Sequence, residues 1–534
     1  MASVNYSIAG EKTQALNGTQ KLGLTLATFA FFLVLLSWGG LTLNPAGLFL
    51  FLTLGGFASG TILYTIGTYK GHTAGIKNTG NFFNSFTNIG ALGWIAAIVL
   101  TLFYVSLYWF PEYLGLNSKG ANTGLVAMFE PLSQLLRKKS ADQWFVYGTF
   151  YTLAILFLGI KFIVKYRHNK YHLIRTIVVM FSQLVLAYFI PNILEALNTT
   201  EVGYYSTNPI NSYPLNYDFF AKSRIDARIA DENQPLGMAY LVWGIILFLV
   251  VTPIVTYYVG KRWYCSWFCG CGGLAETAGD PFRHLSNKST KAWKLERWVM
   301  HSVMVFVLVM TLAIMYSYFA GKDFKLNFII KDRFTGMLIL LAGLALGFAM
   351  FIWFYLKDKS KSRNYLLAAA LIIVVLAIVM MTSYALDAKN AFGFSSKGIK
   401  KSYGFFVGAI FSGIIGVGFY PLLGNRVWCR FGCPMAGYMG IIQRFKSRFR
   451  ITTNGGQCIS CGNCSTYCEQ GIDVRAYAQS GQNIVRASCV GCGVCSAVCP
   501  RGVLKLENGP EDERIYDNPI IIGNDSVQMN PNVK

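Results

Sequence analysis

Eight of the thirteen cysteines in this chain lie in one short stretch near the C-terminus. They form two runs with identical internal spacing, offset from each other by 31 positions (458 to 489, for example). The runs are Cys458, Cys461, Cys464 and Cys468, followed by Cys489, Cys492, Cys495 and Cys499. Three cysteines at steps of three place their sulfurs around a tight loop, where they can hold three corners of an iron–sulfur cubane. The spacing therefore predicts a duplicated iron–sulfur module in which each cluster needs one ligand from elsewhere.

The fourth ligand is expected to cross over between the runs. In the bacterial C-x2-C-x2-C-x3-C-P run, the fourth cysteine ligates the cluster of the other run. Zinc sites usually pair two C-x2-C knuckles, and cysteines this close together on a loop are poor disulfide partners. We therefore predict two [4Fe-4S] clusters, with the ligand sets Cys458, Cys461, Cys464 and Cys499, and Cys489, Cys492, Cys495 and Cys468.

Residues 450–507 resemble a bacterial-type two-cluster ferredoxin domain. The two copies also agree beyond their cysteines, where Gly471-Ile472 corresponds to Gly502-Val503 and supplies an apolar residue that can shield a cluster. One departure is that Glu469 follows the first run, whereas Pro500 follows the second. This departure changes no ligand.

The composition places the rest of the chain in a membrane. Of the 534 residues, 54% are apolar and only 13% are charged, against about 25% charged in soluble proteins. The net charge of +22 raises the question of nucleic acid, but the cations fall in short clusters between apolar runs, as the positive-inside rule predicts. We expect membrane lipid as a partner and no nucleic acid. Residues 1–20 are polar and lack a basic start, so no cleavable signal is predicted.

Ten apolar runs are long enough to cross a hydrocarbon core of about 30 Å. They lie near residues 22–39, 46–67, 89–110, 144–164, 174–194, 237–260, 298–319, 334–356, 365–385 and 403–423. If the first run crosses outward, the dense basic clusters, such as 261–297 and 426–450, fall on one side with both termini. This parity predicts a multi-pass protein of the cell inner membrane, with both termini and the ferredoxin domain in the reducing cytoplasm.

The predicted fold is an all-α polytopic membrane bundle that carries a small C-terminal α+β ferredoxin-like domain with two [4Fe-4S] clusters. Its expected parts are N-terminal membrane helices of unassigned role (1–197), an outer loop (198–236), a membrane core (237–449), the two-cluster domain (450–507) and a polar tail (508–534). The outer loop contains no cysteine or histidine. We expect it to cap the bundle, with a docking surface as the alternative.

The other five cysteines include a second repeat. A glycine, an arginine, an aromatic residue and two cysteines keep register between residues 260–269 and 424–433. Residues four apart share one face of an α-helix, so each C-x3-C pair can present two sulfurs toward one point. The predicted metal or redox centre consists of Cys265, Cys269, Cys429 and Cys433. Packing of small apolar side chains is the alternative, and Cys271 has no assigned role.

Two C-x3-C motifs followed by a two-cluster domain resemble the polyferredoxin-type membrane 4Fe-4S protein family. That family includes the membrane ferredoxin-type subunit of periplasmic nitrate reductase systems, the nitrous oxide reductase regulator and a cytochrome oxidase copper accessory protein. Cys429, Cys433 and Pro434 match its C-x3-C-P motif, whereas Gly270 replaces the proline of the first motif. The resemblance covers residues 237–507 and implies electron transfer that supports a respiratory or metalloenzyme-maturation system.

The leading hypothesis is a membrane iron–sulfur electron-transfer protein that links a quinol or cytoplasmic donor to a protein redox partner. The alternative is an assembly factor that handles copper or another metal, since thiolates suit Cu(I). A subunit of a larger complex is a third possibility. No phosphate-binding glycine motif or nucleophilic triad is present, so an electron-transfer component is favoured over a stand-alone enzyme.

The histidines and one acidic loop offer two weaker hypotheses. A membrane haem needs ligands on facing helices, but only His301 lies in an apolar run, while the others are expected in inner loops: His72, His168, His172 and His284. The stretch from Glu276 to His284 either borders a quinol site or forms a capped loop.

Overall fold

The computed structural model describes most of the chain. The described residues are 15–72, 74–76, 89–118, 120–197, 208–211, 213–221, 225, 234–320, 333–356, 363–386, 388, 390–454 and 457–508. The predicted polar tail lies outside them except for Asn508.

Within these residues, nine helical segments are long and apolar enough to span a membrane. They are α1 (Gly18–Trp38), α2 (Ala46–Tyr69), α3 (Ala91–Trp109), α6 (Gln143–Lys165), α7 to α8 (Lys170–Phe181, a π-helical segment, then Ile190–Leu197), α10 to α11 (Gln234–Ile246, a π-helical turn, then Thr252–Val259), α13 (Thr290–Ala320), α15 (Arg363–Ala385) and α16 with the π-helical η7 (Ser396–Tyr403, Gly404–Gly418). The remaining predicted span, 334–356, is helix α14 (Arg333–Leu356), whose described apolar part, Phe334–Ala349, is shorter. The protein is thus a helical membrane protein, and the count of ten spans stays a prediction.

Small residues bring the first two helices together. A Cβ atom added to Gly60 would lie 2.7 Å from the Gly23 carbonyl oxygen and 2.9 Å from the Ala27 nitrogen, so the two backbones are nearly in contact. Lipid tails are as apolar as the helix surfaces, so the hydrophobic effect does not drive helices together within a membrane. Close van der Waals packing of this kind contributes to their association instead. Large apolar side chains such as Phe51 and Ile95 are exposed on the outside of the bundle, where lipid would cover them.

Shorter elements close the two ends of the bundle. The end away from the C-terminal domain carries η1 (Pro111–Leu114), α4 (Gly124–Met128) and α5 (Glu130–Arg137). The loop between α8 and α10 contributes Tyr213 and Phe219 to the main apolar core, so its described part covers the bundle. The domain end carries η4 (Trp263–Phe268), α12 (Gly270–Thr277), η5 (Asp280–Leu285), α17 (Tyr420–Leu423), η8 (Trp428–Gly432) and α18 (Pro434–Lys446).

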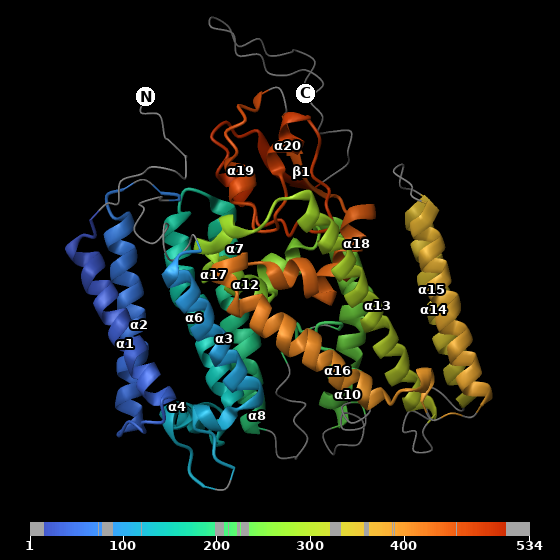
Figure 1. The fold of residues 1–534 in the computed structure, drawn as a ribbon, viewed down its shortest axis with the longest axis horizontal. Coiled ribbons are helices and arrows are strands. Elements are labelled where there is room, and N and C mark those ends of the chain that lie inside the picture. Colours follow the sequence, from blue (N-terminus) through green and yellow to red (C-terminus); the bar gives the residue numbers. More distant parts are fainter. Residues whose placement is uncertain are drawn as a thin grey trace, which may run out of the picture.

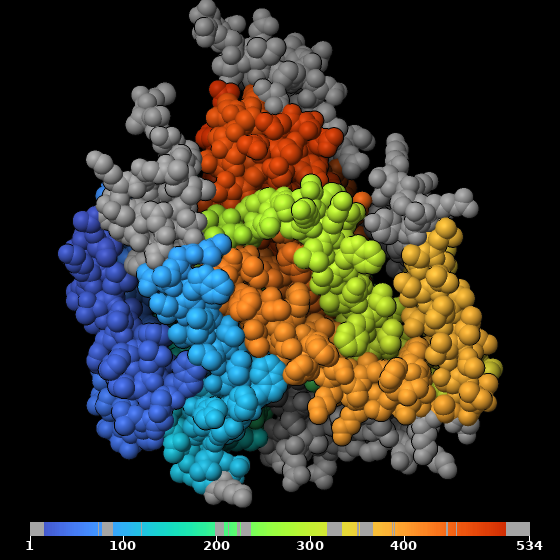
Figure 2. Space-filling view, in the orientation of Figure 1, coloured from blue at the N-terminus to red at the C-terminus, as the bar shows by residue number. Residues whose placement is uncertain are grey.

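The C-terminal domain is a small α+β unit seated on one end of the bundle. Strands β1 (Phe449–Thr453) and β2 (Leu504–Asn508) pair antiparallel, with Phe449 opposite Asn508 and Thr453 opposite Leu504. Between them lie α19 (Asn463–Thr466), α20 (Val474–Gln479) and α21 (Val494–Ala497). Figure 1 shows the domain above α7 and α18, and Figure 2 shows it resting on the segment that leads into α13.

Candidate metal centres

The two cysteine runs of the domain share one backbone conformation. Helix α21 repeats α19 after 31 residues (463 to 494), and the left-handed glycines recur at the same offset, with φ 80° at Gly462 and 85° at Gly493, and 63° and 64° at Gly471 and Gly502. Such φ values favour glycine because it lacks a Cβ atom. The sequence duplication is therefore also a structural duplication.

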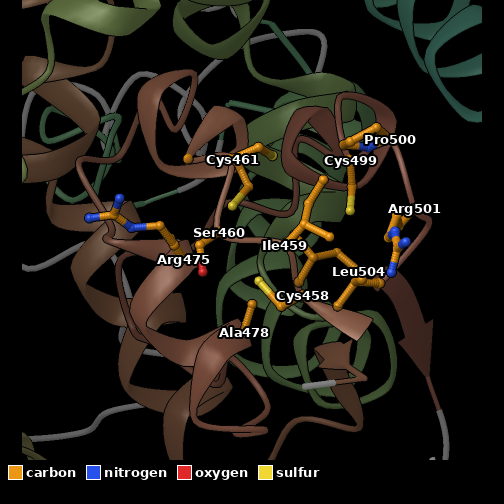
Figure 3. Close-up of a pocket in the computed structure, with 13 residues that line it drawn as sticks. Cys458, Ile459, Ser460, Cys461, Arg475, Ala478, Cys499, Pro500, Arg501 and Leu504 are labelled. Atoms are coloured by element: carbon orange, nitrogen blue, oxygen red, sulfur yellow. The ribbon is translucent and has the colours of Figure 1, made fainter. Parts of the chain in front are cut away.

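Four cysteines from both runs line one pocket at the outer end of the domain. Three come from the first run and the fourth from the second: Cys458, Cys461, Cys464 and Cys499. Figure 3 shows the sulfurs of Cys458, Cys461 and Cys499 pointing into a common space. Apolar side chains such as Val503 and Leu504 complete the walls. We call these four residues the outer cysteine group.

The other four cysteines lie on the side of the domain that faces the bundle. Burial, followed by the neighbouring Cys492, Cys468 and Cys489, raises the pKa of Cys495 well above its usual value. Cys468 of the first run therefore lies close to Cys489 and Cys495 of the second run, and Cys464 also lies near Cys495. We call Cys468, Cys489, Cys492 and Cys495 the inner cysteine group.

The donor set of each group fits a [4Fe-4S] cluster. Each has four sulfur donors, three from one run and one from the other, as the bacterial pattern requires. Among the described residues, no three or more His, Cys, Asp or Glu side chains converge closely enough to hold a single metal ion. A cubane is larger than an ion, so its ligands surround a space, as the outer cysteine group does.

Ser460 and Gly491 occupy the same left-handed position in the two cysteine loops. We predict that substituting them changes the free energy of unfolding in opposite directions. At Gly491 (φ 62°), a Cβ would lie 2.8 Å from Cβ of Arg262 and 2.9 Å from Cζ of Phe449. Gly491→Ala should therefore lower the free energy of unfolding by at least ~1–2 kcal/mol, whereas Ser460→Gly (φ 59°) should raise it by a few tenths to ~1 kcal/mol. Thermal unfolding of both variants tests this. Equal shifts in the same direction would contradict it.

The two C-x3-C motifs also repeat in structure, but not as α-helices. Gly260 (φ 74°) and Gly424 (φ 93°) begin each motif, and π-helical turns η4 and η8 carry the first cysteines. The second cysteines, Cys269 and Cys433, have extended backbones and cap helices α12 and α18. The expectation that each pair shares a face of an α-helix is wrong, because the backbone N–H of each second cysteine bonds five residues back rather than four.

The membrane cysteines nevertheless belong to one buried cluster. Cys265, Cys269, Cys429 and Cys433 pack in the same apolar core, which partly buried Cys271 and Cys492 also contact. Burial raises the pKa of Cys433 well above its usual value, with the charges of Cys429, Cys265 and Cys269 adding to the effect. A hydrogen bond from the Cys271 thiol instead lowers the pKa of Cys269 to about 7. No sequence pattern indicates this role of Cys271.

The loop of the inner cysteine group is bonded directly to the first C-x3-C motif. The Ser266 hydroxyl, between Cys265 and Cys269, donates a 2.8 Å hydrogen bond to the carbonyl of Val490, which lies between Cys489 and Cys492. The Gln443 amide of α18 donates to the Cys489 carbonyl at 2.7 Å. The domain is therefore fixed to the bundle at its cysteine loop.

A buried ion-pair network reinforces this junction. Glu469, next to Cys468, is 1% exposed and pairs with Arg283 at 2.5 Å and with Arg426 at 3.0 Å. Burial alone would raise the pKa of Glu469, but the two guanidinium groups outweigh burial and hold it below its usual value. Arg426 also donates to the Cys429 sulfur at 3.6 Å and to the Cys265 carbonyl at 3.2 Å. The charge of Glu469 is thus linked through Arg426 to both C-x3-C motifs.

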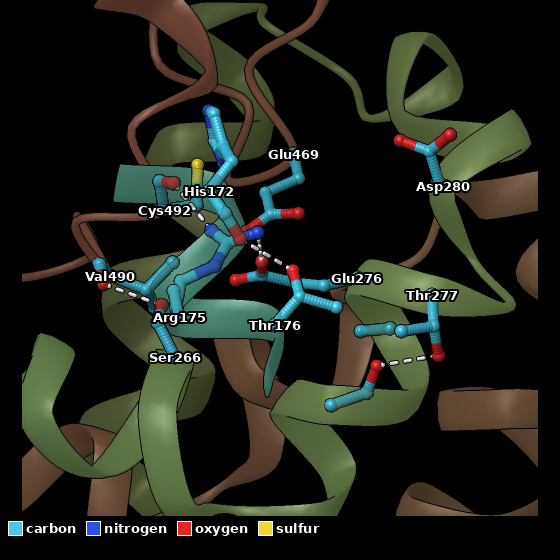
Figure 4. A network of polar contacts seen from close by, with 12 residues as sticks. His172, Arg175, Thr176, Ser266, Glu276, Thr277, Asp280, Glu469, Val490 and Cys492 are labelled. Carbon is cyan, nitrogen blue, oxygen red and sulfur yellow. Dashed lines mark hydrogen bonds and ion pairs between the residues drawn. The ribbon is translucent and has the colours of Figure 1, made fainter. Parts of the chain in front are cut away.

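Arg175 extends the network into the membrane helices. It pairs with Glu276 and donates to the Cys492 carbonyl, as Figure 4 shows. Asp280 pairs with Lys165 and, at 2.8 Å, with Arg283. The two carboxylates of the 276–284 stretch are therefore both paired with buried cations.

One sequence expectation about this region is corrected. His172 does not lie in a loop, because α7 begins at Lys170 and buries the imidazole against Tyr166 and Phe162. His301 lies on the apolar helix α13, as expected, and its side chain is exposed.

Models of known protein families match three regions of the chain: the C-terminal domain and the two regions that contain the C-x3-C motifs. Residues 450–500 match the model of the 4Fe-4S dicluster domain. The chain carries ferredoxin domains. The model of the 4Fe-4S binding domain matches twice, at residues 241–289 and 403–452, and each match contains one C-x3-C motif.

One curated relative supports electron transport in general terms. The Escherichia coli (strain K12) protein named "Putative electron transport protein YccM" is 38% identical over 50 residues, which are 9% of this chain and 14% of that protein. The match thus spans about one seventh of the relative's length. No solved structure matches the chain. The matches and the apolar helices support a membrane iron–sulfur protein of electron transport.

Proposed function

We propose that this protein carries electrons between a two-cluster domain and a further centre at the membrane cysteines, Cys265, Cys269, Cys429 and Cys433. The outer and inner cysteine groups would each hold one [4Fe-4S] cluster, which supplies one-electron chemistry. The chain's own residues hold the clusters, shield them and fix their separation. The proposal includes a respiratory or maturation protein as redox partner.

The observation that carries this proposal is the Ser266–Val490 hydrogen bond. It directly joins the Cys265–Cys269 motif of the membrane centre to the loop between Cys489 and Cys492 of the inner cysteine group. Cys461 of the outer group is exposed, Cys489 and Cys495 of the inner group are buried, and the membrane cysteines are buried beneath them. We place the three groups in series, because Cys492 of the inner group packs against the apolar core that holds the membrane cysteines, while the outer group includes the exposed Cys461.

We further propose that the domain and both termini face the cytoplasm of a cell with an inner membrane. The buried cations at the junction, Arg175, Arg283 and Arg426, lie at the domain end of the bundle. Positive charge at that end agrees with the positive-inside rule. Thiols also stay reduced in the cytoplasm.

A cavity beside the second C-x3-C motif supports a quinol as electron donor or acceptor. Trp428 and Pro434, which flank Cys429 and Cys433, form one end of it, and Tyr217 of the outer loop forms part of the other. The walls come from α3, α6 and η7 and are mostly apolar or aromatic, which is typical of sites for small apolar ligands. This cavity, rather than the 276–284 stretch, is the quinol site we propose.

Replacing Cys429 and Cys433 by alanine separates electron transfer from copper handling. We expect the double variant to keep the spectra of both domain clusters and to lose quinol-dependent reduction of them by at least about tenfold. Copper bound per protein should stay unchanged. The measurements are the rate of cluster reduction after mixing with a quinol analogue, and metal content after incubation with Cu(I).

The matched control is Cys271→Ala, which removes a neighbouring thiol outside the predicted ligand set. It should reduce the quinol-dependent rate much less than the double variant. Loss of bound copper with intact electron flow in the double variant would instead favour an assembly factor for a copper enzyme.

A further inference from the structure

The outer cysteine group lies at an exposed edge of the domain. Ile459 is 54% exposed, and its neighbours Ser460 and Cys461 are exposed as well. Pro500, next to Cys499, is also exposed. This edge places a small, exposed apolar surface at the pocket of four cysteines.

Two arginines flank this edge. Arg475 on α20 and Arg501 after Cys499 both line the cysteine pocket, and Figure 3 shows them on opposite sides of the sulfurs. Both side chains are exposed, and no acidic residue lines the pocket in the described part of the chain. A partner approaching the outer cysteine group therefore meets an apolar centre with positive charge on either side.

The charge pattern extends over the whole described domain. In residues 450–508, the exposed charged side chains are all cations: Arg475, Arg501 and Lys505. The acidic residues are less exposed: Glu469 is buried at the bundle, whereas the partly buried Asp473 and Glu507 accept hydrogen bonds from Ser465 at 2.6 Å and from Thr452 at 2.7 Å. The exposed charge of the domain is therefore positive, although the junction beneath it is electrically paired.

We infer that this edge, Ile459 to Cys461 with Arg475 and Arg501, is the docking surface for a small, soluble, acidic one-electron carrier protein. The inference rests on the proposed function and names the chemistry of the cytoplasmic partner. Opposite charges steer two proteins together and raise the association rate, while the apolar centre excludes water at contact. Exchange across the contact moves one electron, so the carrier loses what the cluster gains, or the reverse, and no covalent bond changes.

The test measures association directly, with a flavodoxin as the acidic probe. Full-length protein in neutral-lipid nanodiscs is compared with the Arg475→Glu/Arg501→Glu variant. The wild-type association rate constant should fall steeply with added salt, because the Debye length shrinks from about 10 Å at 0.1 M to about 3 Å at 1 M. Charge reversal should lower the rate by tenfold or more at low salt and leave little difference at high salt.

The matched control is Lys291→Glu/Lys294→Glu. It makes the same change in net charge at exposed positions of α13, and should alter the rate less than about twofold. Equal losses in the two variants would overturn the docking surface in favour of a general charge effect. Binding that requires anionic lipid in the nanodisc would show that the edge binds the bilayer instead, and would overturn it too.

Iron content and the dithionite-reduced spectrum are measured on the same preparations. Protein that holds its clusters but binds flavodoxin equally before and after charge reversal contradicts the docking surface alone. Protein purified without iron contradicts both the docking surface and the proposed function.

Discussion

Replacing Glu469 by alanine is expected to release the ferredoxin domain from the bundle. The substitution leaves Arg283 and Arg426 buried without their shared carboxylate, and removing one partner of a buried ion pair typically costs about 3–5 kcal/mol. The cost falls on the junction, because Glu469 is the residue through which the domain reaches these arginines. Hydrogen exchange of residues 465–473 and 283–286 should rise by about a hundredfold or more.

Glu507→Ala is the control for this prediction. Glu507 is a partly buried carboxylate of the same domain that bonds to Thr452 at 2.7 Å on the strand pair. Its removal should leave exchange at the junction unchanged. Glu469→Gln keeps the shape of the side chain and should have an intermediate effect. Unchanged protection in Glu469→Ala would show that the hydrogen bonds at Val490 and Cys489 hold the domain by themselves.

Cys468 and Cys499 are the fourth cysteines of the two runs, and each is predicted to bind the cluster of the other run. Replacing either one by serine should therefore remove the cluster of the other run and leave the cluster of its own run. Cys499→Ser is expected to abolish the exposed cluster whose other predicted ligands are Cys458, Cys461 and Cys464, because these four line one pocket. Cys468→Ser should abolish the buried cluster instead. Each variant should lose about four irons, which is one cubane.

The surviving clusters can be told apart by their surroundings. In Cys468→Ser the remaining cluster should bleach quickly with a water-soluble chelator, because Cys461 is exposed. In Cys499→Ser it should bleach slowly, because Cys489 and Cys495 are buried. The opposite assignment would show that each run binds its own cluster without crossing.

Some of the architecture follows from the sequence because its signals are local. The length of each apolar run predicts the position of a spanning helix. The 31-residue cysteine repeat predicts a duplicated loop, and Gly462 and Gly493 have matching backbone conformations in the two copies. The start of α7 was misplaced because Lys170, His172 and Arg175 resemble loop residues in composition. They are accommodated in the helix because Arg175 pairs with Glu276, about a hundred residues away in the chain.

The junction between the domain and the bundle was not predictable, because it is formed by residues that are far apart in the sequence and meet only in the folded protein. Glu469 stands out in the sequence only as the absence of a proline, and nothing near it indicates Arg283 or Arg426. The C-x3-C pairs have an α-helical spacing, but the turns that carry them are π-helical, and Gly260 and Gly424 set their entry from the preceding helices. The departure from the proline pattern was the one signal that could have directed attention to Glu469.

Metal analysis with redox titration of anaerobically purified full-length protein tests the central claim most directly. Two cubanes in the domain predict about eight irons and about eight acid-labile sulfides per chain, with more if the membrane cysteines hold a cluster. Reduction should give two electron paramagnetic resonance signals that titrate separately, one lost in Cys499→Ser and the other in Cys468→Ser. Stoichiometric zinc with no iron would contradict the account.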